Sequence, residues 1–212
     1  MPCTDKTAYL ITNHAPIEIL SEYKNIRGDV IAVDAGLKIV HQLGLTPACM
    51  IGDFDSLEPE MLEHYPEVPV IRHKAQKNET DTELALQYCL EQGYREILIC
   101  NDMQGRFDHA MGLLQNLLYI HLQGCKGCIE SSNQRLFFLD NDSRIATRQQ
   151  ALLSLIPFGG DAEFHSSVNL AYPLENLYIP AHQSRGISNV CLSEEVQIRL
   201  KRGSVLAILT IF

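Results

Sequence analysis

The chain has 212 residues, of which 46% are hydrophobic and 20% charged, as is typical of a globular protein with an ample core. Its net charge of -9 argues against nucleic acid as a partner, because nucleic-acid binding normally requires a basic face. There is no stretch of the roughly 18 apolar residues that a membrane span needs and no signal-peptide pattern, so we expect a cytoplasmic protein without a membrane partner.

Strand-like and helix-like segments alternate from the N-terminus through residue 124. Strands are expected at residues 8–12, 30–33, 48–51, 68–71 and 97–100, and helices at residues 37–45, 80–92 and 108–123. Thr80 and Glu83 begin the second of these helices with the spacing of a capping box. This alternation predicts a three-layer α/β domain with a mostly parallel sheet, in which ligands bind beyond the carboxyl ends of the strands.

The second part of the chain has a different pattern. Strand-like segments separated by glycine, proline and asparagine turns lie at residues 136–139, 151–156, 177–179, 196–200 and 205–212. Short strands of this kind indicate an antiparallel sandwich or barrel. We place the boundary so that residues 1–127 form the α/β domain and residues 128–212 the β domain.

Seven cysteines are scattered along the chain. Cys125 and Cys128 form a C-x-x-C pair, with His121 as a conceivable third metal ligand. A structural zinc site needs four ligands, usually from two spaced pairs, so we expect an incidental pair of reduced thiols.

Asp53 and Asp55 follow the apolar segment 48–51 and are separated by Phe54. If these residues stay extended, both carboxylates lie on one side of the chain, roughly 6.5 Å apart. This spacing suits one or more hard divalent cations. The alternative is an ordinary turn after a strand, where glycine, aspartate and serine are common.

Three more polar groups follow strands or precede helices. Asp34 comes directly after the second strand and could contact a ligand or cap the next helix. Asp81 lies at a helix N-terminus, where the helix dipole alone would favour a carboxylate. Lys77 could reach a phosphate group or remain an ordinary surface lysine.

Gly105 and Arg106 directly precede a long helix. Free backbone N–H groups and a guanidinium at such a place form an anion site. Asp108 could cap this helix, bind a metal or orient a substrate hydroxyl, and His109 could act as a base or simply pack. Carboxylates and an arginine are what phosphoryl transfer requires, and the chain has no P-loop motif.

The sequence resembles the thiamin pyrophosphokinase family over nearly its whole length. The runs that carry this resemblance are Val33–Gly36, Ile51–Ser56, Lys77–Asp81, Gly105–His109, Ser154–Pro157, Leu170–Leu174 and Ser184–Asn189. The resemblance implies an enzyme that transfers the diphosphate of ATP to the hydroxyl of thiamin, giving thiamin diphosphate and AMP. It also implies Mg²⁺, a C-terminal β-sandwich, and a homodimer with active sites between the subunits.

The resemblance further implies a role for individual residues. Magnesium is expected at Asp53, Asp55 and Asp81, and the thiamin hydroxyl at Asp108. We assign the nucleotide side of the site to Asp34, Lys77, Gly105 and Arg106, and the thiamin ring to Ser188 and Asn189.

The chain departs from the family pattern at Ala35, Asn78, Ala171 and the run Asn101–Gln104, where glycine, an acid, a basic residue and a glycine-rich segment are usual. We expect these departures to change affinity and donor preference rather than the reaction. Two other functions are compatible with the motifs. One is a metal-dependent phosphohydrolase with Asp53 as its nucleophile. The other is a non-catalytic sensor of thiamin or nucleotide.

Overall fold

The computed structural model describes residues 6–22, 27–58, 60–72 and 79–211. The chain forms two compact units, Met1–Ser132 (unit 1) and Asn133–Phe212 (unit 2). Lys77 and Asn78 lie outside the described residues.

Unit 1 contains a parallel sheet. Its strands are β1 (Thr7–Ile11), β2 (Asp29–Val33), β3 (Cys49–Gly52), β4 (Val70–Arg72), β5 (Glu96–Cys100) and β6 (Lys126–Glu130). The order across the sheet is β4-β3-β2-β1-β5-β6, and every neighbouring pair in this part of the sheet is parallel. The chain moves in one direction from β1 to β4 and then returns to the other side of β1 for β5. This reversal is the topological switch point where ligands bind in open α/β sheets.

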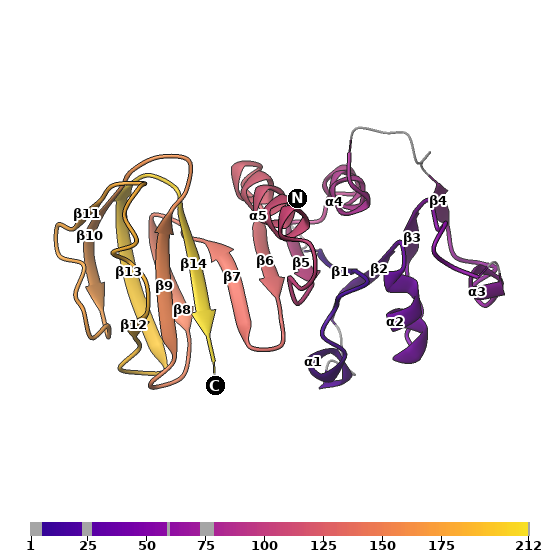
Figure 1. Cartoon of the computed structure of the whole chain (residues 1–212), viewed down its shortest axis with the longest axis horizontal. Coiled ribbons are helices and arrows are strands. Elements are labelled where there is room, and N and C mark those ends of the chain that lie inside the picture. The colour runs from indigo at the N-terminus through magenta and orange to yellow at the C-terminus, as the bar shows by residue number, and fades with distance from the viewer. Residues whose placement is uncertain (1–5, 23–26, 59, 73–78, 212) are drawn as a thin grey trace. The chain divides into compact units, whose positions relative to one another are not determined.

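Helices cover both faces of this sheet (Figure 1). One face carries α1 (Ile17–Glu22), α2 (Gly36–Gln42) and α3 (Glu60–Glu63), and the other carries α4 (Asp81–Glu91) and α5 (Phe107–Leu122). This division follows from right-handed crossovers, because the direction of movement along the sheet changes after β4. Among the described helices, none is both long and apolar enough to cross a membrane.

The core of unit 1 explains its strand sequences. A parallel sheet covered on both faces needs continuous apolar strands rather than alternating ones, and β3 is buried at every position. On the α1–α3 face, Leu37 and Val40 of α2 pack with Met50 of β3 and with Phe54 beyond it. Burial of a side chain such as Phe54 contributes about 1.5–3 kcal/mol to folding. The loop after β3 is therefore fixed to the core at Phe54.

Unit 2 is a β-sandwich. Its strands are β7 (Gln134–Phe138), β8 (Asp142–Ala146), β9 (Leu152–Pro157), β10 (Ala162–Val168), β11 (Tyr178–Ile179), β12 (Asn189–Val190), β13 (Glu195–Arg202) and β14 (Val205–Thr210). Within unit 2 the pairing orders are β12-β9-β14-β7 and β11-β10-β13-β8, and all of these pairs are antiparallel. Side chains from both sheets, including Leu155, Phe164, Ile198 and Ala207, form one core. The sandwich, rather than the barrel, is thus the fold of the second unit.

The structure confirms the strands and helices expected up to residue 122, with small shifts at their ends. The sequence pattern did not predict α1, α3, β6, β8, β10 and β12. In β6 only Ile129 and Glu130 are buried, so it lacks the continuous apolar run of the other central strands. Because β6 pairs with β5, it belongs to unit 1, which extends to Ser132.

Candidate active site

Three carboxylates meet where β2 and β3 end. These two strands are parallel neighbours, with Val33 opposite Ile51, so the residues that follow them lie at the same edge of the sheet. Asp34, Asp53 and Asp55 each offer one oxygen atom, and these atoms all lie within 4.8 Å of one another. A side chain at Gly52 would come within 3.0 Å of the Asp34 Cα atom, so glycine is what lets the two loops approach this closely.

The loop after β3 reaches this arrangement through a turn. Phe54 has φ 60°, so the expected extended conformation of residues 53–55 is wrong. The Phe54 ring is buried in the core, and its backbone N–H donates to Oδ1 of Asp34 at 3.2 Å. The N–H of Asp55 donates to Oδ1 of Asp53 at 3.2 Å. A left-handed residue between the two aspartates thus brings their carboxylate oxygens within 4.8 Å of each other, closer than the roughly 6.5 Å spacing of an extended strand.

Asp34 does not cap α2. The N-cap residue is Ala35, and no side chain caps the helix. Asp34 has φ 47°, a conformation that aspartate tolerates better than most residues. Burial raises the pKa of the Asp34 carboxyl, and the charges of Asp81 and Asp53 raise it further. Asp34 is therefore a partly buried carboxyl in a field of negative charge, which a cation would relieve.

Asp81 is the first residue of α4. The expected cap is confirmed, since the Thr80 hydroxyl accepts a hydrogen bond from the Glu83 N–H at 3.2 Å. The charge of Asp81 raises the pKa of Asp34, so the two carboxyls lie close enough to interact. Among the described residues, the close cluster consists of Asp34, Asp53 and Asp55, and the Asp81 carboxylate is not part of it.

The donor set fits magnesium. All three close ligand atoms are carboxylate oxygens, which Mg²⁺ prefers, at distances of about 2.1 Å. Carboxylate oxygens this close to one another can share one cation.

Lys38 also reaches the edge of the sheet where β2 and β3 end, a contact that was not predicted from the sequence. It lies in the first turn of α2, and its Nζ donates to the Ser56 carbonyl at 3.1 Å. In the sequence, the only indication of this contact is that Lys38 lies four residues after Asp34. The contact fixes the loop that carries Asp53 and Asp55 to the helix that follows Asp34.

Arg106 and Asp108 form an ion pair at the start of α5. Arg106 is the N-cap residue and makes no side-chain cap, whereas Oδ1 of Asp108 accepts a hydrogen bond from the His109 N–H in the first turn at 3.0 Å. The guanidinium donates twice, from Nε to Oδ1 at 3.1 Å and from Nη2 to Oδ2 at 2.5 Å. This pairing raises the pKa of Arg106 and lowers the pKa of Asp108. The side chains are 73% and 63% exposed, so the pair is weak and can exchange for another partner. His109 is exposed, so packing does not explain it.

In unit 2, Ser188 and Asn189 have different environments. Asn189 is buried, and its amide holds both backbone groups of Tyr172: Oδ1 accepts from the N–H at 3.0 Å and Nδ2 donates to the carbonyl at 2.7 Å. Ser188 is exposed and has φ 60°, and its N–H donates to the Ser154 hydroxyl at 3.0 Å. The structure therefore gives Asn189 a structural task and leaves Ser188 accessible.

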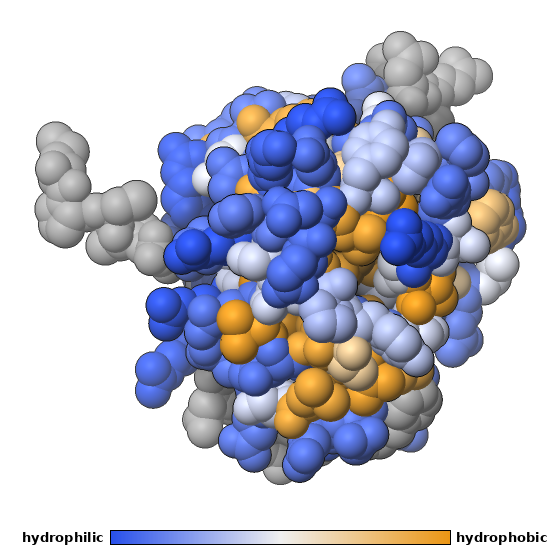
Figure 2. All heavy atoms as spheres, turned by 90° about the vertical axis from the view of Figure 1, so that its left-hand side faces the viewer, coloured by the Kyte–Doolittle hydropathy of each residue, from blue (hydrophilic) through white to orange (hydrophobic). Residues whose placement is uncertain are grey.

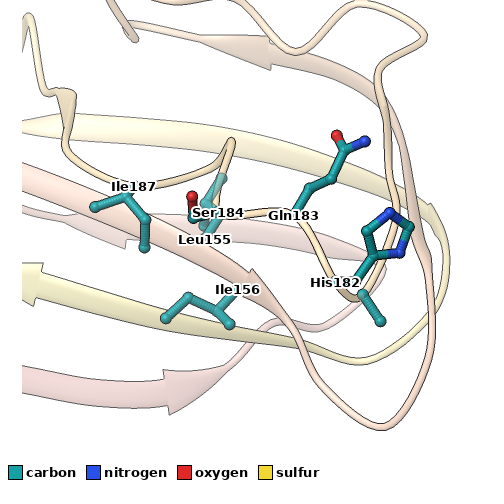
Figure 3. A pocket seen from close by; sticks show the side chains of 7 residues that line it. Leu155, Ile156, His182, Gln183, Ser184 and Ile187 are labelled. Atoms are coloured by element: carbon teal, nitrogen blue, oxygen red, sulfur yellow. The ribbon is translucent and has the colours of Figure 1, made fainter.

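A cavity of about 240 Å³ lies next to this segment. It is lined by Leu155, Ile156, Ala181, His182, Gln183, Ser184 and Ile187. Figure 3 shows His182 and Gln183 toward one end and Ile187 toward the other. Gly186 permits the loop to approach β9, because a Cβ atom there would lie 2.0 Å from the Leu155 carbonyl oxygen.

The surface of unit 2 is not uniformly polar. Figure 2 shows hydrophobic groups gathered among hydrophilic ones on the side of the molecule that faces the viewer. Large hydrophobic residues of unit 2 that are exposed are Val168, Tyr172, Tyr178, Ile187 and Leu192. Of these, Tyr172 is the backbone partner of Asn189, and Ile187 directly precedes Ser188.

Comparisons with known proteins agree with this division. A family model described as "Thiamin pyrophosphokinase, catalytic domain" matches residues 22–129, and one described as "Thiamin pyrophosphokinase, vitamin B1 binding domain" matches residues 142–205. The thiamine pyrophosphokinase of Bacillus subtilis is 30% identical over 186 residues, covering 84% of this chain and 85% of its own. Thiamin pyrophosphokinase 1 of Caenorhabditis elegans is 25% identical over 172 residues, covering 76% of this chain and 70% of its own.

Solved structures have the same fold. The crystal structure of the Bacillus subtilis thiamine pyrophosphokinase covers 98% of this chain and 100% of its own, with a TM-score of 0.87 at 24% identity. That of the yeast thiamin pyrophosphokinase covers 99% of this chain and 87% of its own, with a TM-score of 0.80 at 16% identity. With both family models matching in order and a relative 30% identical over most of its length, the chain belongs to the thiamin pyrophosphokinase family.

Proposed function

We propose that this chain transfers the diphosphate of ATP to the hydroxyl of thiamin through a Mg²⁺ site at the carboxyl edge of the unit 1 sheet. The activity follows from family membership, which makes the chain an enzyme, a thiamin diphosphokinase. The single observation that supports this site is the cluster of Asp34, Asp53 and Asp55. Its oxygens come from two neighbouring strand ends and lie within 4.8 Å of one another.

Asp53 and Asp55 would hold Mg²⁺, with Asp34 as a third ligand and Asp81 beside them. When bound, Mg²⁺ would supply positive charge that neutralises the charge developing on the phosphates during diphosphate transfer. Phe54 keeps both aspartates turned out of the core, and Lys38 fixes the far end of their loop. The ligands are thus preorganised before the nucleotide arrives.

Arg106 would exchange its partner when ATP binds. In the free protein its guanidinium is held by Asp108, and a phosphate offers the same planar pair of acceptors. Release of Asp108 from Arg106, whose hydrogen bonds hold its pKa down, would make the carboxylate more basic and free to accept the hydrogen of the thiamin hydroxyl. The hydroxyl oxygen would then attack the β-phosphorus of ATP, and AMP would leave. Gly105 and the predicted contact of Lys77 belong to the nucleotide side of the same site.

Unit 2 would bind the thiamin ring. Ser188 is the exposed member of the predicted pair and is the better direct contact, while Asn189 would act by fixing the Tyr172 backbone. The neighbouring cavity offers apolar walls at Ile156 and Ile187 together with polar groups. This mixture is typical of sites for small organic ligands.

A homodimer with active sites between subunits is part of the proposal. Phe107 at 77%, Met111 at 38% and Leu122 at 67% exposure lie four and eleven residues apart along α5, close to one line on the helix. Apolar side chains in such a row favour burial against another surface. Light scattering should give twice the chain mass, and a monomer would contradict this part. A cytoplasmic location stays a prediction from the sequence.

The direct test is incubation with ATP, Mg²⁺ and thiamin, followed by mass detection of thiamin diphosphate and AMP. Equal amounts of the two products are expected, and chelation of the metal should abolish both. Phosphate released without an acceptor would instead indicate a phosphohydrolase with Asp53 as nucleophile. Binding of thiamin or nucleotide without any product would indicate a sensor.

A further inference from the structure

A buried polar network joins β1 and β5 at the switch point of the sheet. Thr12 and Asn101 are the first residues beyond these two strands, and they are 4% and 6% exposed. The Thr12 hydroxyl donates to the Cys100 carbonyl at 2.8 Å and accepts from Nδ2 of Asn101 at 2.8 Å. These side-chain hydrogen bonds join the carboxyl ends of the two strands.

Asn101 also determines the path of the chain that leads to Arg106. Its Oδ1 accepts from the Met103 N–H at 2.6 Å, and its own N–H donates to the Glu130 carbonyl at 3.0 Å. Met103 has φ 53°, an uncommon conformation for a residue other than glycine. Such a conformation persists only where its surroundings fix it, and the Asn101 side chain supplies that constraint.

Asp102 adds a second fixed point. Its N–H donates to the His14 carbonyl at 2.7 Å. Its carboxylate accepts from the N–H and the hydroxyl of Ser132, at 2.6 and 2.8 Å to Oδ1. The segment 101–103 is therefore held by the loop after β1 and by the chain after β6. Gly105, with φ 87°, follows as the point where the chain turns toward Arg106.

We propose that Asn101 is a positioning residue that acts through Arg106: by fixing the segment 101–103 it aims the guanidinium at the phosphates of the bound nucleotide. This inference rests on the proposed function. In this chain the Asn101 and Asp102 side chains hold the loop by hydrogen bonds. Asn101 itself is buried and its side chain bonds Thr12 and Met103, so its effect is on orientation.

Truncation of Asn101 has a specific expected result. Asn101→Ala removes the constraint on Met103 and leaves the Thr12 hydroxyl without its donor. Arg106 then samples many orientations, and productive alignment with phosphate is lost. The affinity for Mg²⁺-ATP, measured by calorimetry, should fall about tenfold, as should kcat/KM for ATP, while KM for thiamin stays within about twofold.

A double-mutant cycle with Arg106 separates positioning from general destabilisation. In the Arg106→Ala background, Asn101→Ala should change ATP affinity by less than about twofold, because the group that it positions is already absent. The matched control is Asn116→Ala, which truncates another buried asparagine of unit 1, in the middle of α5. It should lower the melting temperature without changing ATP affinity.

Thr12 provides a second pair of variants. Thr12→Val removes the hydroxyl that holds Asn101 and should weaken ATP binding in the same direction, whereas Thr12→Ser keeps the hydroxyl and should restore it. If Asn101→Ala does not fold, Thr12→Val and Thr12→Ser test the proposal in its place.

An equal loss of ATP affinity in both Arg106 backgrounds would overturn the proposal, as would wild-type affinity in Asn101→Ala or in Thr12→Val. Failure of the wild type to form thiamin diphosphate while it still binds ATP would instead sink the proposed function. The binding cycle remains a test of Asn101 in that case.

Discussion

The backbone N–H of Phe54 donates a hydrogen bond to Oδ1 of Asp34, with 3.2 Å between the two atoms. This contact joins the loop after β3 to the loop after β2. It satisfies one lone pair of a carboxylate whose pKa is raised by burial and by neighbouring acids. A strained turn residue thus serves two purposes, since its ring anchors the loop in the core and its N–H fixes a metal-ligand candidate.

Asp55→Asn is expected to reduce turnover at least about a hundredfold, the scale of losing one preorganised electrostatic contact. The substitution removes a ligand charge but keeps the side-chain shape. AMP released per thiamin consumed is the appropriate measurement. Glu58→Gln removes an exposed carboxylate three residues along the chain and should leave turnover unchanged. Near-normal turnover in Asp55→Asn would contradict the metal assignment.

Asp34→Asn should have opposite effects on stability with and without magnesium. Asparagine tolerates the positive φ of this position and still offers Oδ1 to Phe54. Without metal, the variant should melt at a higher temperature because repulsion from Asp53 and Asp81 is relieved. Added Mg²⁺ should raise the melting temperature of the wild type but much less that of the variant. An equal Mg²⁺-dependent rise in both proteins would exclude Asp34 as a ligand.

Ser188 and Asn189 should separate into a binding and a structural residue. Asn189→Ala leaves both backbone groups of Tyr172 without their partner and should destabilise the protein by about 1–3 kcal/mol. Ser188→Ala should keep the unfolding free energy and raise KM for thiamin severalfold. Denaturant unfolding and steady-state kinetics check the two. A stability loss in Ser188→Ala with unchanged KM would reverse the assignment.

Asp161 should make the stability of the protein depend on pH on the acid side. Its carboxylate accepts from the Tyr178 hydroxyl and from the Ala181 N–H at 2.9 Å, and these bonds lower its pKa. A carboxyl whose pKa is lower in the folded than in the unfolded state stabilises the protein at pH values above its unfolded-state pKa of about 3.9. This stabilisation is lost as the pH falls through the folded-state pKa. The difference in unfolding free energy between wild type and Asp161→Asn should therefore shrink below about pH 4.

The control for this prediction is Asp140→Asn, which removes another exposed carboxylate of unit 2. Its difference from the wild type should vary less with pH over the same range. A constant difference between wild type and Asp161→Asn from pH 7 to pH 2 would contradict the role of these hydrogen bonds.

Much of the fold could be read from the sequence because its strands carry strong local signals. The apolar runs of β1, β2, β3 and β5 and the capped helix at Thr80 are each recognisable within a few residues. β6 was missed because its pairing with β5 comes from tertiary contact rather than from an apolar pattern of its own. Short helices such as α3, which has no buried residue, leave little trace in the sequence.

The site was partly predictable for the same reason. Asp53, Asp55 and Arg106 were found because they follow a strand or precede a helix. That Asp34 belongs with the first two was left open, since a residue after a strand can cap a helix equally well. Lys38 and Asn101 were missed as functional candidates because their contacts reach residues that are distant in sequence.

By itself, the sequence determined the alternation of the main strands and helices up to residue 122, the family and the carboxylates available for a cation, because these depend on periodicity and on residue type. Only the tertiary structure decided which oxygens converge, that Phe54 turns instead of extending, and that Asn189 holds backbone while Ser188 stays accessible. These choices depend on backbone angles and on contacts between distant segments. A linear pattern carries neither, because packing selects one of several local conformations of nearly equal energy.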